Sequence, residues 1–123
     1  MTQPDAPNPG NFLPLSPQQF HILLSLARQD RHGYGVIQDV AARTGETMGT
    51  GTLYTAIARL ADLELIEEKD EDDGRRRYYR LTRLGRAVLD AETVRLEALV
   101  RLARREGLGR RPGTRPAPAK GRP

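Results

Sequence analysis

A mainly α-helical fold with one small β-hairpin is predicted by three observations on this chain of 123 residues. Apolar residues recur at the spacing of a single helix face, which predicts helices over about residues 17–28, 34–43, 51–63 and 83–105. Strand-like alternation on both sides of an acidic turn predicts a hairpin over residues 65–69 and 76–81. The chain has no cysteine, so packing rather than disulfides must hold this small domain together.

Local signals mark where the first and last helices begin. Ser16 and Gln19 have the spacing of a capping box, with Pro17 at the first helical position. Thr82 precedes the last helical segment and can cap it. These signals support the boundaries that the periodicity predicts.

The predicted helix over residues 51–63 has two unlike faces. Its core-facing stripe repeats at i, i+4 and i+7 and consists of Leu53, Ile57 and Leu60. Thr52, Thr55 and Arg59 point away from that stripe. Short hydroxyl side chains and one guanidinium can enter a DNA major groove without steric conflict. An ordinary solvated helix face has a similar composition, so this helix alone does not establish DNA binding.

A basic strand follows the acidic turn over residues 70–74. Its residues Arg75, Arg76 and Arg77 would contact the DNA backbone or the minor groove. The alternative is that they pair with the acids of the turn, because exposed ion pairs form easily and contribute little. A helix followed by a basic hairpin is the order of a winged helix-turn-helix, so the two features together predict that fold.

The net charge of +4 is unevenly distributed along the chain. Residues 1–106 carry a net charge of −1, whereas residues 107–123 carry +5. DNA binding by the folded part must therefore depend on local clusters of basic residues rather than on its overall charge.

Composition divides the chain into four parts. Residues 1–14 are rich in proline and are expected to be disordered, and residues 15–82 are expected to form a winged-helix DNA-binding domain. Residues 83–106 are expected to form a dimerisation helix, and residues 107–123 are expected to be a basic disordered tail. The tail could add contacts to phosphates or could serve only to keep the protein in solution.

The last predicted helix has the pattern of a two-helix seam. Apolar residues recur along one face, with Glu92 and Thr93 interrupting them. The expected dimerisation residues are Leu89, Leu96, Leu99, Val100 and Ala103.

Five motifs occur in the order and spacing of a known family. They are Leu15-Ser16-Pro17, His32-Gly33-Tyr34-Gly35, Gly51-Thr52-Leu53-Tyr54, Leu65-Ile66 and Arg77-Tyr78-Tyr79-Arg80-Leu81-Thr82. On these motifs, about residues 15–105 resemble PadR-like transcriptional regulators of the short subgroup with a single C-terminal helix. The resemblance implies a winged helix, a two-fold dimer formed by the last helix, and repression released by a small effector.

Two positions depart from the family's pattern. The family commonly has Ser-Pro before Gly-Thr-Leu-Tyr, whereas this chain has Gly49 and Thr50, either of which can cap the helix. The family often has glycine before Leu-Ile, where the helix ends in a left-handed turn, whereas this chain has Glu64. A non-glycine residue in that conformation costs about 1 kcal/mol, unless the helix ends in another way.

The expected DNA contacts come from the third helix and the basic strand. Arg59 can bond guanine bidentately, threonine can meet a phosphate or a thymine methyl group, and a half-buried Tyr54 could reach a phosphate. The full set is Thr50, Thr52, Tyr54, Thr55, Arg59, Arg75, Arg76 and Arg77.

These observations favour a homodimeric transcriptional regulator, a repressor, that binds a pseudo-palindromic operator in double-stranded DNA. The rival interpretation is a winged helix used as a protein-interaction module without specific DNA binding. A small-molecule effector could act through Phe20 and Tyr34 near the junction of the first and last helices. At the entry into the second helix, Tyr34 is expected either to pack or to bond to the backbone.

Other classes of protein find little support in the sequence. No nucleophile–base pair or carboxylate pair suggests an enzyme, and His21 and His32 lack the spacing of metal ligands. Neither a cofactor nor a metal is therefore expected. No apolar run is long enough to span a membrane and no signal peptide is visible, so the cytoplasm is the expected location.

Overall fold

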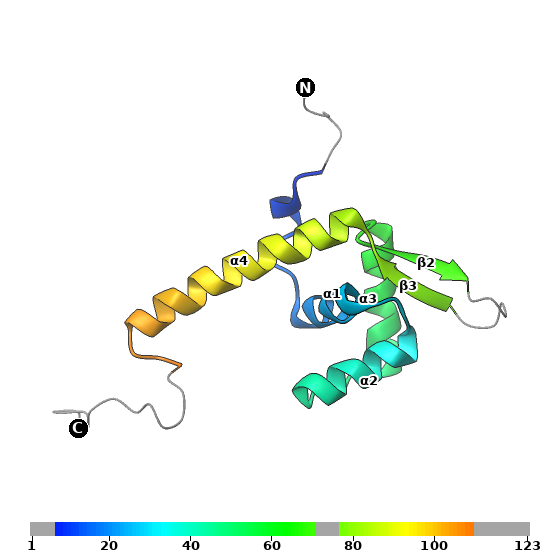
Figure 1. The fold of residues 1–123 in the computed structure, drawn as a ribbon, viewed down its shortest axis with the longest axis horizontal. Helices are drawn as coiled ribbons and strands as arrows, with labels where there is room; N and C mark the ends of the chain where they lie inside the picture. The colour runs from blue at the N-terminus through cyan, green and yellow to red at the C-terminus, as the bar shows by residue number, and fades with distance from the viewer. Residues whose placement is uncertain (1–6, 71–76, 110–123) are drawn as a thin grey trace. The chain divides into compact units, whose positions relative to one another are not determined.

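The computed structural model describes residues 7–70 and 77–109 (Figure 1). The predicted fold class, mainly helical with a small antiparallel sheet, is confirmed. The elements are η1 (Pro9–Phe12), α1 (Pro17–Arg28), β1 (Arg31–His32), α2 (Gly33–Thr44), α3 (Thr50–Asp62), β2 (Ile66–Asp70), β3 (Arg77–Leu81) and α4 (Arg83–Arg105). The chain forms two compact units, Met1–Glu92 and Thr93–Pro123, and α4 contributes residues to both.

The sheet has three antiparallel strands in the order β1-β3-β2. Figure 1 shows the β2–β3 hairpin. The predicted hairpin supplies β2 and β3, and their register places Glu68 opposite Tyr79 and Glu67 opposite Arg80. The short strand β1 was not predicted, because the sequence between α1 and α2 was interpreted as a break. Its Arg31 lies opposite Tyr79, on the other side of β3.

The core of the first unit lies where α1, α2 and α3 meet the sheet and the first turns of α4. The predicted stripe of α3 is buried there as expected. The most deeply buried apolar residues of this core are Ile22, Leu23, Val36, Leu53, Leu60, Leu65, Ile66 and Val88.

The predicted capping box at the start of α1 is confirmed. The Oγ of Ser16 accepts a hydrogen bond from the backbone N–H of Gln19 at 3.1 Å, and Oε1 of Gln19 accepts one from the N–H of Ser16 at 3.0 Å. At the start of α3 the N-cap is Gly49, without a side-chain cap. Thr50 is the first helical residue, so its suggested role as the alternative cap is wrong.

The exit of α3 adopts the left-handed turn that the sequence suggested, with a non-glycine residue in it. Glu64 has a φ of 64°. The N–H of Leu65 donates to the carbonyl of Leu60 at 3.0 Å, and the N–H of Glu64 donates to that of Ala61 at 2.9 Å. These two bonds form a Schellman motif, which satisfies carbonyls at the helix end and offsets the strain at Glu64.

The expected disorder of residues 1–14 is wrong for residues 7–14. That stretch contains η1, and Phe12 and Leu13 pack partly buried against the core. The carboxylate of Glu92, which is 2% exposed, accepts a hydrogen bond from the backbone N–H of Leu15 at 3.0 Å. This bond joins the segment before α1 to α4. Residues 1–6 lie outside the described residues.

The start of α4 is fixed by Thr82 and Gly85. Thr82 caps the helix as predicted, because its Oγ1 accepts a hydrogen bond from the N–H of Gly85 at 2.9 Å. The same hydroxyl donates to the carbonyl of Glu64 at 2.7 Å, and the N–H of Thr82 donates to the carbonyl of Leu65 at 3.1 Å. A Cβ at Gly85 would overlap that Leu65 carbonyl oxygen, so only glycine fits at this contact.

The second unit contains the rest of α4, from Thr93 to Arg105, where Leu99 and Val100 are about half exposed. Leu89, which the sequence assigned to the dimer seam, lies instead in the core of the first unit and is 7% exposed. The spacing of apolar residues could not distinguish burial in the core from burial in a dimer seam, because both kinds of stripe repeat in the same way. Of the predicted tail, only residues 107–109 fall within the described part.

Within the described part of the chain, no helix is both long enough and apolar enough to cross a membrane.

The Gly85 contact predicts a large effect of one added methyl group. Gly85→Ala should reduce the free energy of unfolding by at least ~2 kcal/mol, because the obstacle is backbone and cannot rotate away. Gly51→Ala in α3 is the control, because its Cβ would meet nothing within 4 Å. Urea unfolding at a single protein concentration measures both changes, and equal stabilities of the two variants would contradict the contact.

Candidate nucleic-acid interface

Three of the predicted DNA-facing residues of α3, Thr52, Thr55 and Arg59, lie together on its exposed side, away from the buried stripe. Thr50 is exposed in the first turn and does not line the groove that follows this face. A groove of about 480 Å³ follows this face and is called the α1–α3 groove below. It is lined by Ser16, Gln18, Gln19, Gly51, Thr52, Thr55, Ala56 and Arg59.

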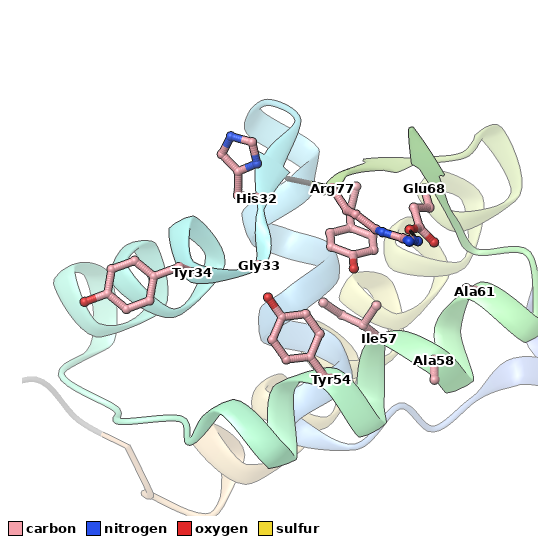
Figure 2. A pocket seen from close by; sticks show the side chains of 10 residues that line it. His32, Gly33, Tyr34, Tyr54, Ile57, Ala58, Ala61, Glu68 and Arg77 are labelled. Atoms are coloured by element: carbon pink, nitrogen blue, oxygen red, sulfur yellow. Dashed lines mark hydrogen bonds and ion pairs between the residues drawn. The ribbon is translucent and has the colours of Figure 1, made fainter. Parts of the chain in front are cut away.

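A second groove, of about 590 Å³, lies between α3 and the sheet and is called the α3–wing groove below (Figure 2). It receives residues from the start of α2, from the other flank of α3 and from both strands of the hairpin. Its lining residues are His32, Gly33, Tyr34, Tyr54, Ile57, Ala58, Ala61, Glu68, Arg77 and Tyr79. Both grooves therefore share α3 as one wall.

Tyr54 faces the α3–wing groove rather than the face that carries Thr52 and Thr55. Its side chain is about half exposed, and Figure 2 shows its hydroxyl directed toward Gly33. A Cβ at Gly33 would overlap the Tyr54 hydroxyl, so glycine is needed for this close approach. Tyr34 is 63% exposed, so the first of its two predicted roles, packing, is wrong. It does not form a site with Phe20, which packs against the core.

Arg77 is held by a carboxylate of the neighbouring strand. It forms an ion pair and hydrogen bond with Glu68 on the sheet side of the groove (Figure 2). The hydrogen bond and the charge of Glu68 raise the pKa of Arg77, so it remains a cation. The sequence suggested acids of the turn as alternative partners, whereas this partner comes from β2. Arg75 and Arg76 lie outside the described residues.

Tyr79 forms the floor of the same groove. It is 7% exposed, and its burial raises its pKa, with smaller contributions from the charge of Glu68 and from Tyr54. Its hydroxyl therefore keeps its proton at neutral pH and can act as a hydrogen-bond donor.

The opposite face of the hairpin carries a similar ion pair. Arg80 donates to Glu67 from Nε at 2.8 Å and also from its terminal nitrogen. These two residues alternate with those of the α3–wing groove and do not line it. The His32 and Tyr78 rings stack, with centroids 4.1 Å apart.

A cluster of charges around Asp39 joins α1, β1 and α2. The Asp39 side chain is 10% exposed and lies 3.4 Å from Arg31 and 3.5 Å from Arg43. Arg28 lies 3.9 Å from it, and the hydroxyl of Ser25 donates to it at 2.7 Å. Three guanidinium groups therefore share one carboxylate and join α1, β1 and α2.

The described residues contain no group of three His, Asp or Glu side chains that could hold a metal ion.

The three helices and the sheet with its β2–β3 wing define a winged helix-turn-helix. The model of the PadR-like family of transcriptional regulators matches residues 22–91, more than half of the chain, and the chain belongs to this family. Members of this family are DNA-binding transcriptional regulators rather than enzymes.

Relatives and solved structures agree with this assignment. The chain is 38% identical over 73 residues to an uncharacterized protein X of Lysinibacillus sphaericus, which covers 55% of this chain and 67% of that protein. It is 36% identical over 74 residues to an uncharacterized 37.1 kDa protein in a transposon of Streptomyces fradiae, covering 60% of this chain but only 21% of that protein. A PadR family transcription regulator from hypervirulent Clostridium difficile has a TM-score of 0.66 at 26% identity, covering 76% of this chain and 100% of that one.

Sequence reasoning missed Glu68 as the partner of Arg77, because that pairing is set by strand register. It also missed the Asp39 cluster, whose members come from three elements. The close contact of Gly33 with Tyr54 was not predicted either, because the two residues are far apart in the sequence.

The contact between Gly33 and Tyr54 predicts a non-additive effect on stability. Gly33→Ala should cost about 1–2 kcal/mol of unfolding free energy, because the Tyr54 ring must be displaced. In a Tyr54→Ala background the same change should cost less than ~0.5 kcal/mol. Gly35→Ala is the matched control, since its Cβ would lie 3.6 Å from that of Arg31, an ordinary contact. Additive costs across this double-mutant cycle would show that Tyr54 is not the obstacle.

Proposed function

We propose that this protein is a homodimeric repressor whose two α3 helices enter successive major grooves of a pseudo-palindromic operator. The observation that carries the proposal is the exposed face of Thr52, Thr55 and Arg59 beside a wing, in a chain of the PadR-like family. The effector-released repression that the family resemblance implies belongs to the same proposal. The cytoplasm, where such a regulator meets DNA, is the proposed location.

The chemistry of α3 supports a division of roles among its side chains. Arg59 can recognise the O6 and N7 atoms of guanine with two hydrogen bonds. Thr52 and Thr55 can donate to phosphates or contact thymine methyl groups. Thr50, in the first turn of α3, is assigned to a phosphate contact. The arginines of the wing are assigned to the backbone, where they would add affinity without base preference.

The second unit supports dimerisation through a second copy of the chain. Leu96, Leu99, Val100 and Ala103 follow one another at i, i+3, i+4 and i+7 on α4. Leu99 and Val100 are 48% and 46% exposed in the single chain. A contiguous, partly exposed apolar stripe is typical of a helix that pairs with another.

The proposed effector has no assigned site. The suggested pair of Phe20 and Tyr34 does not come together, as described above. The described residues after Tyr79 include no aromatic side chain that could stack on a large planar ligand along α4.

The division of roles predicts different effects of two substitutions on DNA binding. Arg59→Ala should cost about 1–3 kcal/mol on a selected operator and little on random DNA, because it removes base recognition. Arg77→Ala should weaken both DNAs to a similar extent and reduce the salt slope by about 1. Operator fragments selected from a random pool, followed by fluorescence anisotropy, measure both effects. Equal losses of the two variants on both DNAs would contradict the assignment.

The rival function, a protein-interaction module, predicts no salt-dependent DNA affinity and no dimer. Anisotropy with genomic DNA fragments over a range of salt concentrations, together with light scattering, separates the two functions. A monomer without measurable DNA affinity would overturn the proposal.

The dimer face predicts a matched pair of substitutions on α4. Leu99→Glu should raise the dimer dissociation constant by at least ~100-fold, since a carboxylate would be buried in the seam. Val94→Glu is the control, because Val94 is 59% exposed and lies on the opposite side of the helix from the stripe. Light scattering as a function of concentration measures both. Dimers of equal strength in the two variants would show that this face is not the interface.

A further inference from the structure

We propose that the α3–wing groove receives one backbone strand of the DNA, and that a DNA phosphate takes the place of Glu68 beside Arg77. This inference rests on the proposed DNA binding and adds a specific role for one carboxylate. It assigns Glu68 as a residue that competes with DNA for a cation of the interface.

The geometry of a helix in the major groove supports the occupant. A helix with its side chains is about 10–12 Å wide, and the major groove is about 12 Å wide. A helix that enters it therefore has one phosphate backbone close to each flank. The α3–wing groove, lined by Tyr54 and Arg77, lies on the flank of α3 beside the face of Thr52, Thr55 and Arg59 that is proposed to meet the bases.

The walls of the α3–wing groove provide the groups that bind a phosphate. The Arg77 guanidinium offers a charge-assisted donor, and Tyr54, which is about half exposed, carries a hydroxyl that can donate as well. The single described carboxylate on the lining is Glu68, which already occupies Arg77. A phosphate in this groove must therefore either replace Glu68 or be repelled by it.

The exposure of the pair makes replacement feasible. The side chains of Arg77 and Glu68 are 66% and 36% exposed, so water and DNA can reach them. Exposed ion pairs contribute little to stability, and exchanging one carboxylate for one phosphate conserves the charge-assisted hydrogen bond. Glu68 then lowers the affinity for every DNA sequence, because each complex must displace it.

The hairpin contains its own control for this idea. Glu67 and Arg80 form an equivalent pair on the other face, with side chains 46% and 51% exposed. Replacing Glu67 or Glu68 by glutamine changes the net charge by the same amount. Only Glu68 lines the groove.

The test compares Glu68→Gln, Glu67→Gln, Arg77→Gln and the double variant Glu68→Gln with Arg77→Gln. Each full-length protein is titrated into a labelled DNA duplex of fixed random sequence, and anisotropy is followed over a series of NaCl concentrations. Thermal unfolding checks that the variants remain folded.

The expected result is selective for Glu68. Glu68→Gln should increase affinity about three- to tenfold, as expected for relieving competition at one phosphate contact, and Glu67→Gln less than about twofold. Arg77→Gln should make the salt slope shallower by about 0.9, and in its presence Glu68→Gln should have little further effect.

Three results would overturn the inference. Equal gains from both glutamine substitutions would indicate a general charge effect, and an unchanged or lower affinity of Glu68→Gln would show that Glu68 does not compete. If Glu68→Gln increased DNA affinity as much in the Arg77→Gln background as in the unchanged protein, Glu68 would not be competing for Arg77. If the unchanged protein lacks salt-dependent DNA affinity, the proposed function itself fails; if it binds and the variants behave as just described, only this inference fails.

Discussion

The carbonyl oxygen of Leu65 lies at the junction on which the arrangement of the DNA-binding unit depends. It accepts the N–H of Thr82, and α4 can approach it only because Gly85 has no side chain. The hydroxyl of Thr82 simultaneously joins the carbonyl of Glu64 to the N–H of Gly85. Because an unpaired buried backbone group costs about 1–3 kcal/mol, these bonds hold the end of α3 and the starts of β2 and α4 in one arrangement.

This junction has a direct consequence for the surface that meets DNA. The helix α3 leads through the turn at Glu64 into β2 (Figure 1), so the helix and the wing cannot change their spacing independently. The groove between them therefore has fixed walls, with Tyr54 on one side and Arg77 on the other. Fixed walls matter here because residues 1–106 carry a net charge of −1 and do not attract DNA as a whole. Under the proposed function, the positions of a few cationic side chains, rather than their number, would determine where the DNA phosphate backbone lies.

Much of the fold could be predicted from the sequence because its signals are local. The capping box at Ser16, the stripe of α3 and the cap at Thr82 depend on residues a few positions apart. The features that could not be predicted join distant parts of the chain. The strand β1 has only two residues, and the partner of Arg77 depends on strand register. For the site, sequence placed Thr52, Thr55 and Arg59 on one face but could not show that Tyr54 turns to the other flank.

The helix α4 shows why a periodic pattern alone cannot assign an interface. Leu89 and Leu96 are seven residues apart and share one predicted stripe, yet Leu89 lies in the core and the stripe continues onto the exposed Leu99 and Val100. The exposed part of the α4 stripe favours pairing with a second copy of the chain, and DNA binding gives a further reason for such pairing. Base contacts of good geometry contribute about 1–3 kcal/mol each, and one α3 offers only three candidate side chains for them. Joining two half-sites makes the second binding event intramolecular, so that the same few contacts act twice. The proposed dimer would therefore supply what a nearly neutral domain with so small a reading face lacks, namely a second set of the same contacts.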